Sequence, residues 1–165
     1  MLLFFRVLRI LLKNIFSRRH AVLDESKLGL RVWPTDMDLN FHLNDGRYIS
    51  LAGLGRIDLM LGTGLLRRAM KRGWYPVVGA GMIRYRRELK SLEKFSLRSR
   101  VVGWDDKWIY FEHRFEKSGG DLAAIAYARG VLRNREGAIP TLDVMALVGH
   151  TEPSPPLPDF VGKFL

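Results

Sequence analysis

The segment from Asp45 to Leu61 is apolar on almost every side, and this property limits the possible folds more than any other feature of the sequence. Its apolar side chains, which cover most of a helical surface, are Tyr48, Ile49, Leu51, Ala52, Leu54, Ile57, Leu59, Met60 and Leu61. Gly62 and Gly64 then end the helix. A helix that is apolar all round is buried, so the rest of the chain must wrap around it.

Strand-like segments flank this helix in the sequence. Residues 27–33 alternate apolar and polar side chains, which is the period of a half-buried strand. A short helix is predicted over residues 65–72, followed by strands over 77–87, 95–104, 108–116 and 122–133. Short, turn-rich connections join the last three strands and predict an antiparallel meander. The pattern therefore predicts an α+β domain, with an antiparallel sheet curled around one long central helix.

The N-terminal sixteen residues predict a strongly apolar amphipathic helix, with Arg6, Arg9 and Lys13 on one stripe. The segment is short for a bilayer span, which needs ~20 apolar residues. We therefore expect it to lie at an anionic membrane surface, with Arg18 and Arg19 also near the head groups. The alternative is a helix that packs on the domain or on a partner subunit.

Composition limits the domain organisation and the partners. The 165 residues suit one globular domain, expected over residues 21–140, after the N-terminal helix segment 1–20 and before a short helix and Pro-rich arm over 141–165. A formal net charge of +10 favours an anionic partner, such as a membrane surface or a phosphate-bearing ligand. No recognised nucleic-acid motif accompanies the charge, so nucleic acid is not the expected partner. The expected location is cytoplasmic, peripheral at the membrane through residues 1–20.

A polar segment between the first strand and the long helix carries the candidate chemistry. Residues 36–48 read Asp-x-Asp-x-Asn-x-His-x-Asn and then Asp-Gly-Arg-Tyr. Asp38, Asn40 and His42 occupy alternating positions, which in an extended loop would place all three side chains on one side. A carboxylate, an amide and an imidazole would then share one pocket.

The start of the long helix supplies a complementary group of donors. Asn44 is predicted as the helix N-cap, and the N–H groups near Asp45, Gly46 and Arg47 have no partner within a helix. Such donors stabilise negative charge that develops on a carbonyl oxygen. The loop and the helix start therefore predict an oxyanion site beside a carboxylate.

These residues resemble the active-site segment of hotdog-fold thioesterases, most closely the 4-hydroxybenzoyl-CoA thioesterase-like and acyl-ACP thioesterase families. The resemblance implies the hotdog fold and hydrolysis of an acyl-CoA or acyl-carrier-protein thioester. It implies a homodimer, or a dimer of dimers, with active sites at the subunit interface. It assigns the role of nucleophile or general base to Asp38, and catalytic roles to Asn40 and His42. Asp45 departs from the family pattern, in which a second Asn is common, and adds a negative charge beside the oxyanion site.

Other polar residues receive different interpretations. Asp36 is expected to serve a turn or an ion pair, and His113 to lie in the core or an interface. The basic residues expected to contact the phosphates of coenzyme A are Arg84, Arg86, Arg87 and Lys90. No metal-ligand spacing is present, and no cofactor is expected.

Two other functions remain open at this point. One is hotdog hydratase or dehydratase chemistry, but the Asp-x-Asn-Pro-x-His pattern of those enzymes needs a proline and one more residue, which this loop lacks. The other is a catalytically weak, membrane-docked module that binds acyl thioesters, with catalysis impaired by Asp45.

Overall fold

The computed structural model describes residues 2–16 and 20–164, so Arg18 and Arg19 lie outside the described residues. The helices are α1 (Leu2–Phe16), η1 (Pro34–Asp36), α2 (Asp45–Gly62), α3 (Leu65–Lys71), α4 (Thr141–Leu147) and η2 (Asp159–Phe164). The strands are β1 (Ser26–Arg31), β2 (Tyr75–Tyr85), β3 (Lys94–Trp104), β4 (Ile109–Lys117) and β5 (Leu122–Arg133). Each predicted helix and strand is present, with ends shifted by only a few residues.

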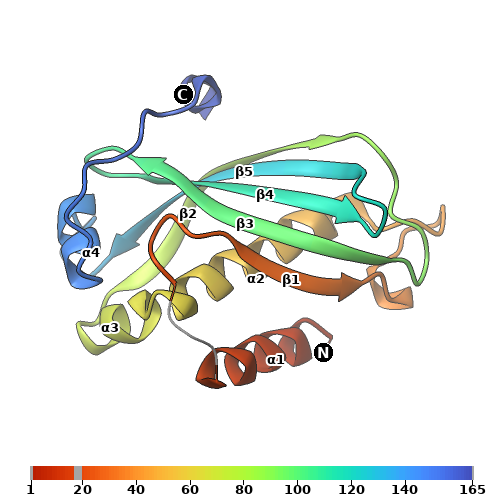
Figure 1. Cartoon of the computed structure of the whole chain (residues 1–165), viewed down its shortest axis with the longest axis horizontal. Coiled ribbons are helices and arrows are strands. Elements are labelled where there is room, and N and C mark those ends of the chain that lie inside the picture. Colours follow the sequence, from red (N-terminus) through yellow and green to blue (C-terminus); the bar gives the residue numbers. More distant parts are fainter. Residues whose placement is uncertain (1, 17–19, 165) are drawn as a thin grey trace.

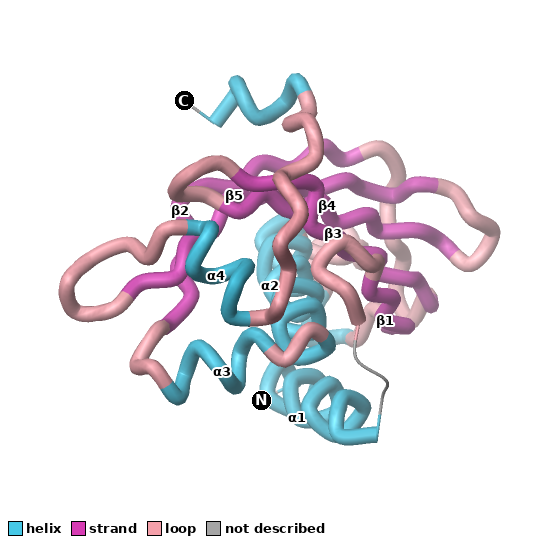
Figure 2. Tube along the Cα trace, turned by 60° about the vertical axis from the view of Figure 1, so that its left-hand side comes forward, coloured by secondary structure: helices cyan, strands magenta, loops and turns pink. Residues whose placement is uncertain are grey.

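The strands form one antiparallel sheet that curls around α2 (Figure 1; Figure 2). Its order is β1-β3-β4-β5-β2, so the predicted meander of β3, β4 and β5 is confirmed. β1 and β2 are the two edge strands and flank α2 in the sequence. The result is the α+β hotdog architecture implied by the sequence resemblance.

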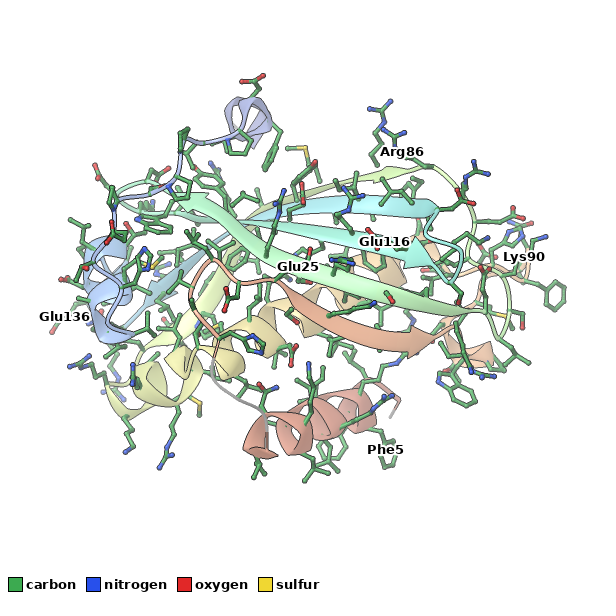
Figure 3. The ribbon with its side chains drawn as sticks, in the orientation of Figure 1. Phe5, Glu25, Arg86, Lys90, Glu116 and Glu136 are labelled. Atoms are coloured by element: carbon green, nitrogen blue, oxygen red, sulfur yellow. The ribbon has the colours of Figure 1, made fainter. Side chains whose placement is uncertain are left out.

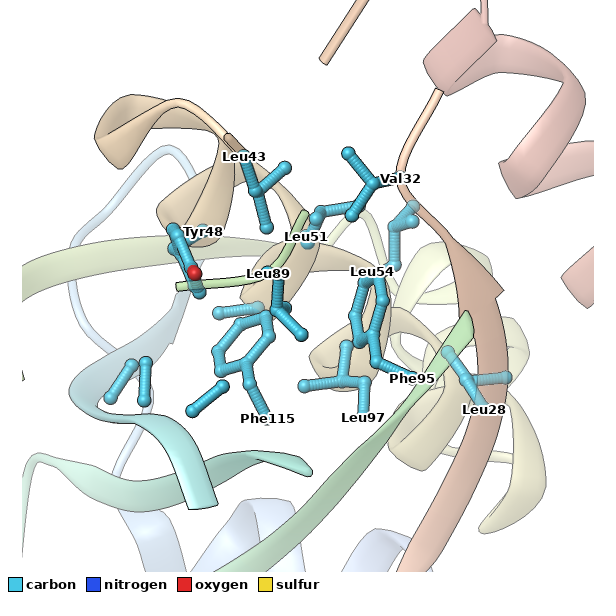
Figure 4. Close-up of a cluster of buried hydrophobic side chains, with 14 of the residues drawn as sticks. Leu28, Val32, Leu43, Tyr48, Leu51, Leu54, Leu89, Phe95, Leu97 and Phe115 are labelled. Atoms are coloured by element: carbon cyan, nitrogen blue, oxygen red, sulfur yellow. The ribbon is translucent and has the colours of Figure 1, made fainter. Parts of the chain in front are cut away.

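The main core lies between α2 and the concave face of the sheet (Figure 4). Leu51 and Leu54 of α2 are each 1% exposed, and Phe115 of β4 is fully buried against them. Burying one such side chain contributes roughly 1.5–3 kcal/mol. These contacts fix α2 to the sheet and thereby fix the position of its first turn.

α1 packs on the domain through one face and leaves its other face exposed. Ile10 is buried, Arg6 forms an ion pair with Asp36, and Lys13 forms an ion pair with Asp58. The expectation that the whole basic stripe faces lipid is therefore wrong for Arg6 and Lys13, because buried carboxylates of the domain attract them inward. Arg9 remains exposed.

The outer face of α1 is apolar. Its exposed large side chains are Leu3, Phe4, Phe5, Leu8, Leu11, Leu12 and Ile15. Figure 3 shows Phe5 pointing away from the sheet. Among the described residues no single helix is long and apolar enough to cross a bilayer, and only α2 and α3 taken together pass that test, across a 79° bend.

Candidate functional site

The loop between η1 and α2 is closed into a small ring. A β-bridge pairs Met37 with Leu43, and the amide of Asp38 donates to the carbonyl of His42 at 3.0 Å. Phe41 adopts the left-handed conformation with a φ of 60°. The extended geometry expected from the alternating residues is therefore wrong, and their spacing does not place the three side chains on one side of a straight backbone.

The carboxylate of Asp38 points into this ring. Its Oδ1 atom accepts hydrogen bonds from the amides of Asn40 at 2.9 Å and His42 at 3.4 Å, which is an Asx-turn. Among the described residues, nothing donates a hydrogen bond to Oδ2 of Asp38. The side chain is partly exposed, so Oδ2 remains accessible to a water molecule or a substrate.

His42 and Asn40 do not contact the Asp38 carboxylate through their side chains. The Nε2 atom of His42 lies 3.4 Å from Oε2 of Glu88, and the His42 side chain is 36% exposed. Asn40 is exposed. Sequence reasoning missed Glu88, because pairing between distant residues, such as the bridge between His42 and Lys90, brings the β2–β3 connection to this loop.

The first turn of α2 lies directly after the loop. Asn44 is the N-cap, as predicted, and its Oδ1 accepts from the amide of Gly46 at 3.0 Å. The amide of Arg47 donates to the carbonyl of Asn44 at 3.0 Å. The Gly46 amide also lies 2.7 Å from Oδ1 of Asp45. Of the three predicted oxyanion donors, the amide of Asp45 is the one without an acceptor among the described residues.

Two tyrosines support the loop and the helix start. The hydroxyl of Tyr85 donates to the carbonyl of Asp45 at 3.2 Å, and its ring packs edge-on against Tyr48. Burial raises the pKa of Tyr48 to about 12, so Tyr48 is neutral at physiological pH. These residues fix the geometry and supply no acid or base near neutral pH.

The predicted phosphate-binding residues lie at the end of β2 and in the connection that follows it. Figure 3 shows Arg86 and Lys90 at the end of the molecule where α2 begins. Arg84, Arg86, Arg87 and Lys90 are all exposed. Arg87 lies 4.0 Å from Asp121, and Lys90 lies 3.5 Å from Glu88. Exposed pairs at such distances contribute little, so these cations remain able to contact an anion.

A second polar cluster lies beneath the middle of α2. The sequence predicted that His113 is buried, but it did not predict the cluster. The Nδ1 atom of His113 is 2.8 Å from Oγ of Ser99, and its Nε2 is 3.3 Å from a guanidinium nitrogen of Arg56. Because arginine only donates, Nε2 accepts, and the proton of the neutral ring is on Nδ1. A Cβ atom at Gly55 would collide with Ser99, so glycine at this position makes room for the cluster.

Burial, assisted by the positive charge of Arg56, lowers the pKa of His113 to about 3. The unfolded chain therefore binds more protons than the folded chain between about pH 3 and pH 6.5. The contribution of His113 to the free energy of unfolding is at its full value only above this pH range. We expect the His113 contribution to fall by about 2 kcal/mol between pH 6.5 and pH 5. Urea unfolding of the wild type and of His113→Gln across this range measures it. Parallel pH profiles for the two proteins would contradict a neutral buried imidazole.

The sequence was also compared with those of known proteins. Residues 32–165 match the model of the thioesterase-like superfamily. Protein THEM6 of Danio rerio is 39% identical over 130 residues, which are 76% of this chain and 63% of that protein. A probable thioesterase of Saccharomyces cerevisiae is 25% identical over 141 residues, which are 84% of this chain and 61% of that protein. The chain thus spans less than two thirds of the length of either relative.

The fold also matches solved structures. A hypothetical protein from Staphylococcus aureus, solved in complex with CoA, superposes with a TM-score of 0.67 at 17% identity. The match covers 87% of this chain and 96% of that chain. At this level of identity the likeness shows the fold.

Proposed function

The chain belongs to the thioesterase-like superfamily, and from this membership we propose that it hydrolyses acyl thioesters with Asp38 as general base or nucleophile. The observation that carries the proposal is the position of the Asp38 carboxylate. One of its oxygens is held by two backbone amides, and the other remains accessible beside the first turn of α2. The test is release of free thiol from a panel of acyl-CoA esters by the wild type and by Asp38→Asn.

In this mechanism Asp38 removes a proton from a water molecule that attacks the thioester carbonyl, or attacks the carbonyl itself. Negative charge then develops on the carbonyl oxygen, where the amide of Asp45 donates a hydrogen bond. His42 and Asn40 position the water molecule or the leaving sulfur. In the first route the carbon–sulfur bond breaks, and the proton taken from water passes to the thiolate. In the second route the same bond breaks to leave an anhydride on Asp38, which water then hydrolyses to the free acid and the Asp38 carboxylate, and the thiolate takes a proton from water.

We assign the substrate carrier to the class with a phosphate-bearing pantetheine arm, which includes acyl-CoA and acyl-carrier protein. Arg84, Arg86, Arg87 and Lys90 are exposed, and the bridge between Lys90 and His42 brings the connection after β2 to the loop. We propose that these cations contact the phosphates of the carrier. The CoA bound to a protein of the same fold supports this assignment. Equal hydrolysis of acyl-CoA and of a short thioester without phosphates would contradict it.

A binding module without strong catalysis is the second candidate. The carboxylate of Asp45 lies beside the proposed oxyanion donor, where it repels developing negative charge. In that case the protein would bind acyl-CoA but release thiol no faster than the Asp38→Asn variant.

The assembly we propose is a homodimer formed through the β2 edges of two copies. β2 is an edge strand of 11 residues, with Tyr75, Val78 and Tyr85 about half exposed. A long apolar edge strand left unpaired is prone to pair with another strand. A two-fold axis makes the pairing antiparallel, which brings the start of one α2 toward the far half of the other. A monomeric mass in analytical ultracentrifugation would contradict this arrangement.

We further propose that the protein docks on anionic membranes through α1. Its exposed apolar face is described above, and a basic groove of about 660 Å³ lies next to it, between α1 and β1. The basic residues of this groove that are available to head groups are Arg9, Lys27, Arg31 and Lys94, and no acidic residue is among its described lining residues. Arg6 and Lys13 also line the groove, but their charges are paired with Asp36 and Asp58. Apolar contact with acyl chains and basic contact with head groups thus come from adjacent surfaces.

Sedimentation with vesicles of phosphatidylcholine and phosphatidylserine tests this docking. We expect the double variant Phe5→Ser with Ile15→Ser to lower the partition coefficient by about tenfold or more, because each apolar side chain contributes on the order of 1 kcal/mol at the interface. High salt should release the wild type only in part, because salt weakens the electrostatic contribution alone. The matched control is Leu142→Ser, because Leu142 lies on α4, away from α1, and is 72% exposed. Equal binding by both variants would contradict docking through α1.

A further inference from the structure

An apolar cavity lies along the second half of α2, away from the Asp38 loop. Its volume is about 260 Å³, and its lining includes Ile57, Met60, Val77, Phe111, Val131 and Met145. A cavity of about 150 Å³ holds one benzene molecule, which has six carbon atoms. In proportion to its volume, this cavity holds about ten carbon atoms. Arg56, at its wall, lies about 16 Å along the helix from Asp45, at 1.5 Å per residue.

Arg56 is the one charged side chain among the described residues that line this cavity. Among the described residues its polar contact is the neutral ring of His113, and none of the ion pairs in that part of the chain includes Arg56. Thr63 is the other polar side chain in the lining, and its hydroxyl already donates to the carbonyl of Leu59 at 3.0 Å. The guanidinium therefore borders an apolar space, is partly exposed there, and has donors that no described residue satisfies.

A charge in such surroundings is costly unless an opposite charge accompanies it. His113 supplies a single acceptor and no negative charge, and burial lowers the pKa of Arg56. A carboxylate is the group that best matches the guanidinium, because its two oxygens accept two parallel hydrogen bonds. The surrounding carbon-rich lining matches an aliphatic chain and excludes a strongly hydrated ligand.

We propose that this cavity binds an aliphatic chain of about ten carbons that ends in a carboxylate paired with Arg56. The carboxylate belongs either to a free fatty acid or to the far end of a dicarboxylic acyl chain. The second case rests on the thioesterase function proposed above, whereas the first does not. Arg56 is thus a residue that selects the ligand, separate from the catalytic residues of the loop.

Isothermal titration calorimetry with decanoate and decanol tests the site without hydrolysis. We expect the wild type to bind decanoate at least tenfold more tightly than decanol. Arg56→Met should remove this preference by weakening decanoate about tenfold, with decanol binding within about twofold of the wild type. Arg56→Lys, which keeps the positive charge, should retain part of the preference. Arg135→Met, an exposed arginine that does not line the cavity, is the matched control.

Equal affinity of the wild type for decanoate and decanol overturns the proposal, and this result does not depend on how any variant folds. Hydrolysis then identifies the source of the carboxylate. A higher kcat/KM for the mono-CoA ester of decanedioate than for decanoyl-CoA, lost in Arg56→Met, indicates a dicarboxylic acyl chain. Equal kcat/KM values alongside tight decanoate binding indicate a free fatty acid. If neither ester is hydrolysed, the proposed enzymatic function fails while the decanoate result still decides this site.

Discussion

Asp38→Asn is expected to lower kcat/KM for acyl-CoA hydrolysis by about 10³-fold, within the range typical for loss of a general base. Asparagine keeps the Oδ1 atom that accepts from the amides of Asn40 and His42, so the loop should keep its shape. The amide nitrogen that replaces Oδ2 accepts no proton from water. Free-thiol detection measures the rate, and thermal unfolding checks the fold.

Asp24→Asn is the matched control, because Asp24 is also a loop aspartate that accepts a hydrogen bond from a backbone amide, that of Ala21 at 2.7 Å. It should leave the rate unchanged. His42→Ala and Asn40→Ala should each cost less than Asp38→Asn, since these residues position groups and do not remove the proton. If Asp38→Asn keeps most of the activity, Asp38 is not the general base. If His42→Ala loses more activity than Asp38→Asn, His42 has that role instead.

Arg6→Met is expected to destabilise the fold by about 3 kcal/mol, because it leaves the carboxylate of Asp36 buried without its cation. The side chains of Arg6 and Asp36 are only 10% and 4% exposed, and the guanidinium contacts both carboxylate oxygens, at 3.1 and 2.6 Å. Arg6 also donates to the carbonyl of Arg31 at 2.8 Å. The expected fall in Tm is about 6–12 °C for a domain of this size, measured by calorimetry.

Arg9→Met, one turn further along α1, removes the same charge from an exposed position and should change the free energy of unfolding by less than about 0.5 kcal/mol. Combining Arg6→Met with Asp36→Asn should recover part of the lost stability, because the buried charge is then removed as well. Equal Tm values for Arg6→Met and Arg9→Met would mean that α1 is not held on the domain by this ion pair.

The secondary structure was predictable because it depends on local periodicity. The apolar surface of α2 and the alternation of apolar and polar side chains in β1 can be seen in consecutive residues of the sequence. The turn-rich connections indicate which neighbouring strands pair. The edge positions of β1 and β2 depend on pairing between distant residues, such as Leu28 with Leu97. Local pattern carries no information on such pairs, so the positions of β1 and β2 in the sheet were not predictable from periodicity.

The candidate site was predictable in its residues and not in its geometry. Local spacing identified Asp38 and the N-cap Asn44, but the positive φ of Phe41 closes the loop, and spacing gives no sign of it. The inward turn of Arg6 was equally hidden, because it depends on a carboxylate 30 residues away. A lone Asp58 within an apolar helix was a usable signal for a cation partner, since a buried carboxylate needs one.

The ring formed by the Asp38 loop is fastened to the connection between β2 and β3. The amide of Leu43 donates to the carbonyl of Leu89 at 2.9 Å, and the amide of Ser91 donates to the carbonyl of Phe41 at 3.2 Å. These backbone bonds belong to the folded chain and need no ligand to form. The entropy of ordering the loop is therefore lost once, during folding, and need not be lost again each time a ligand binds there.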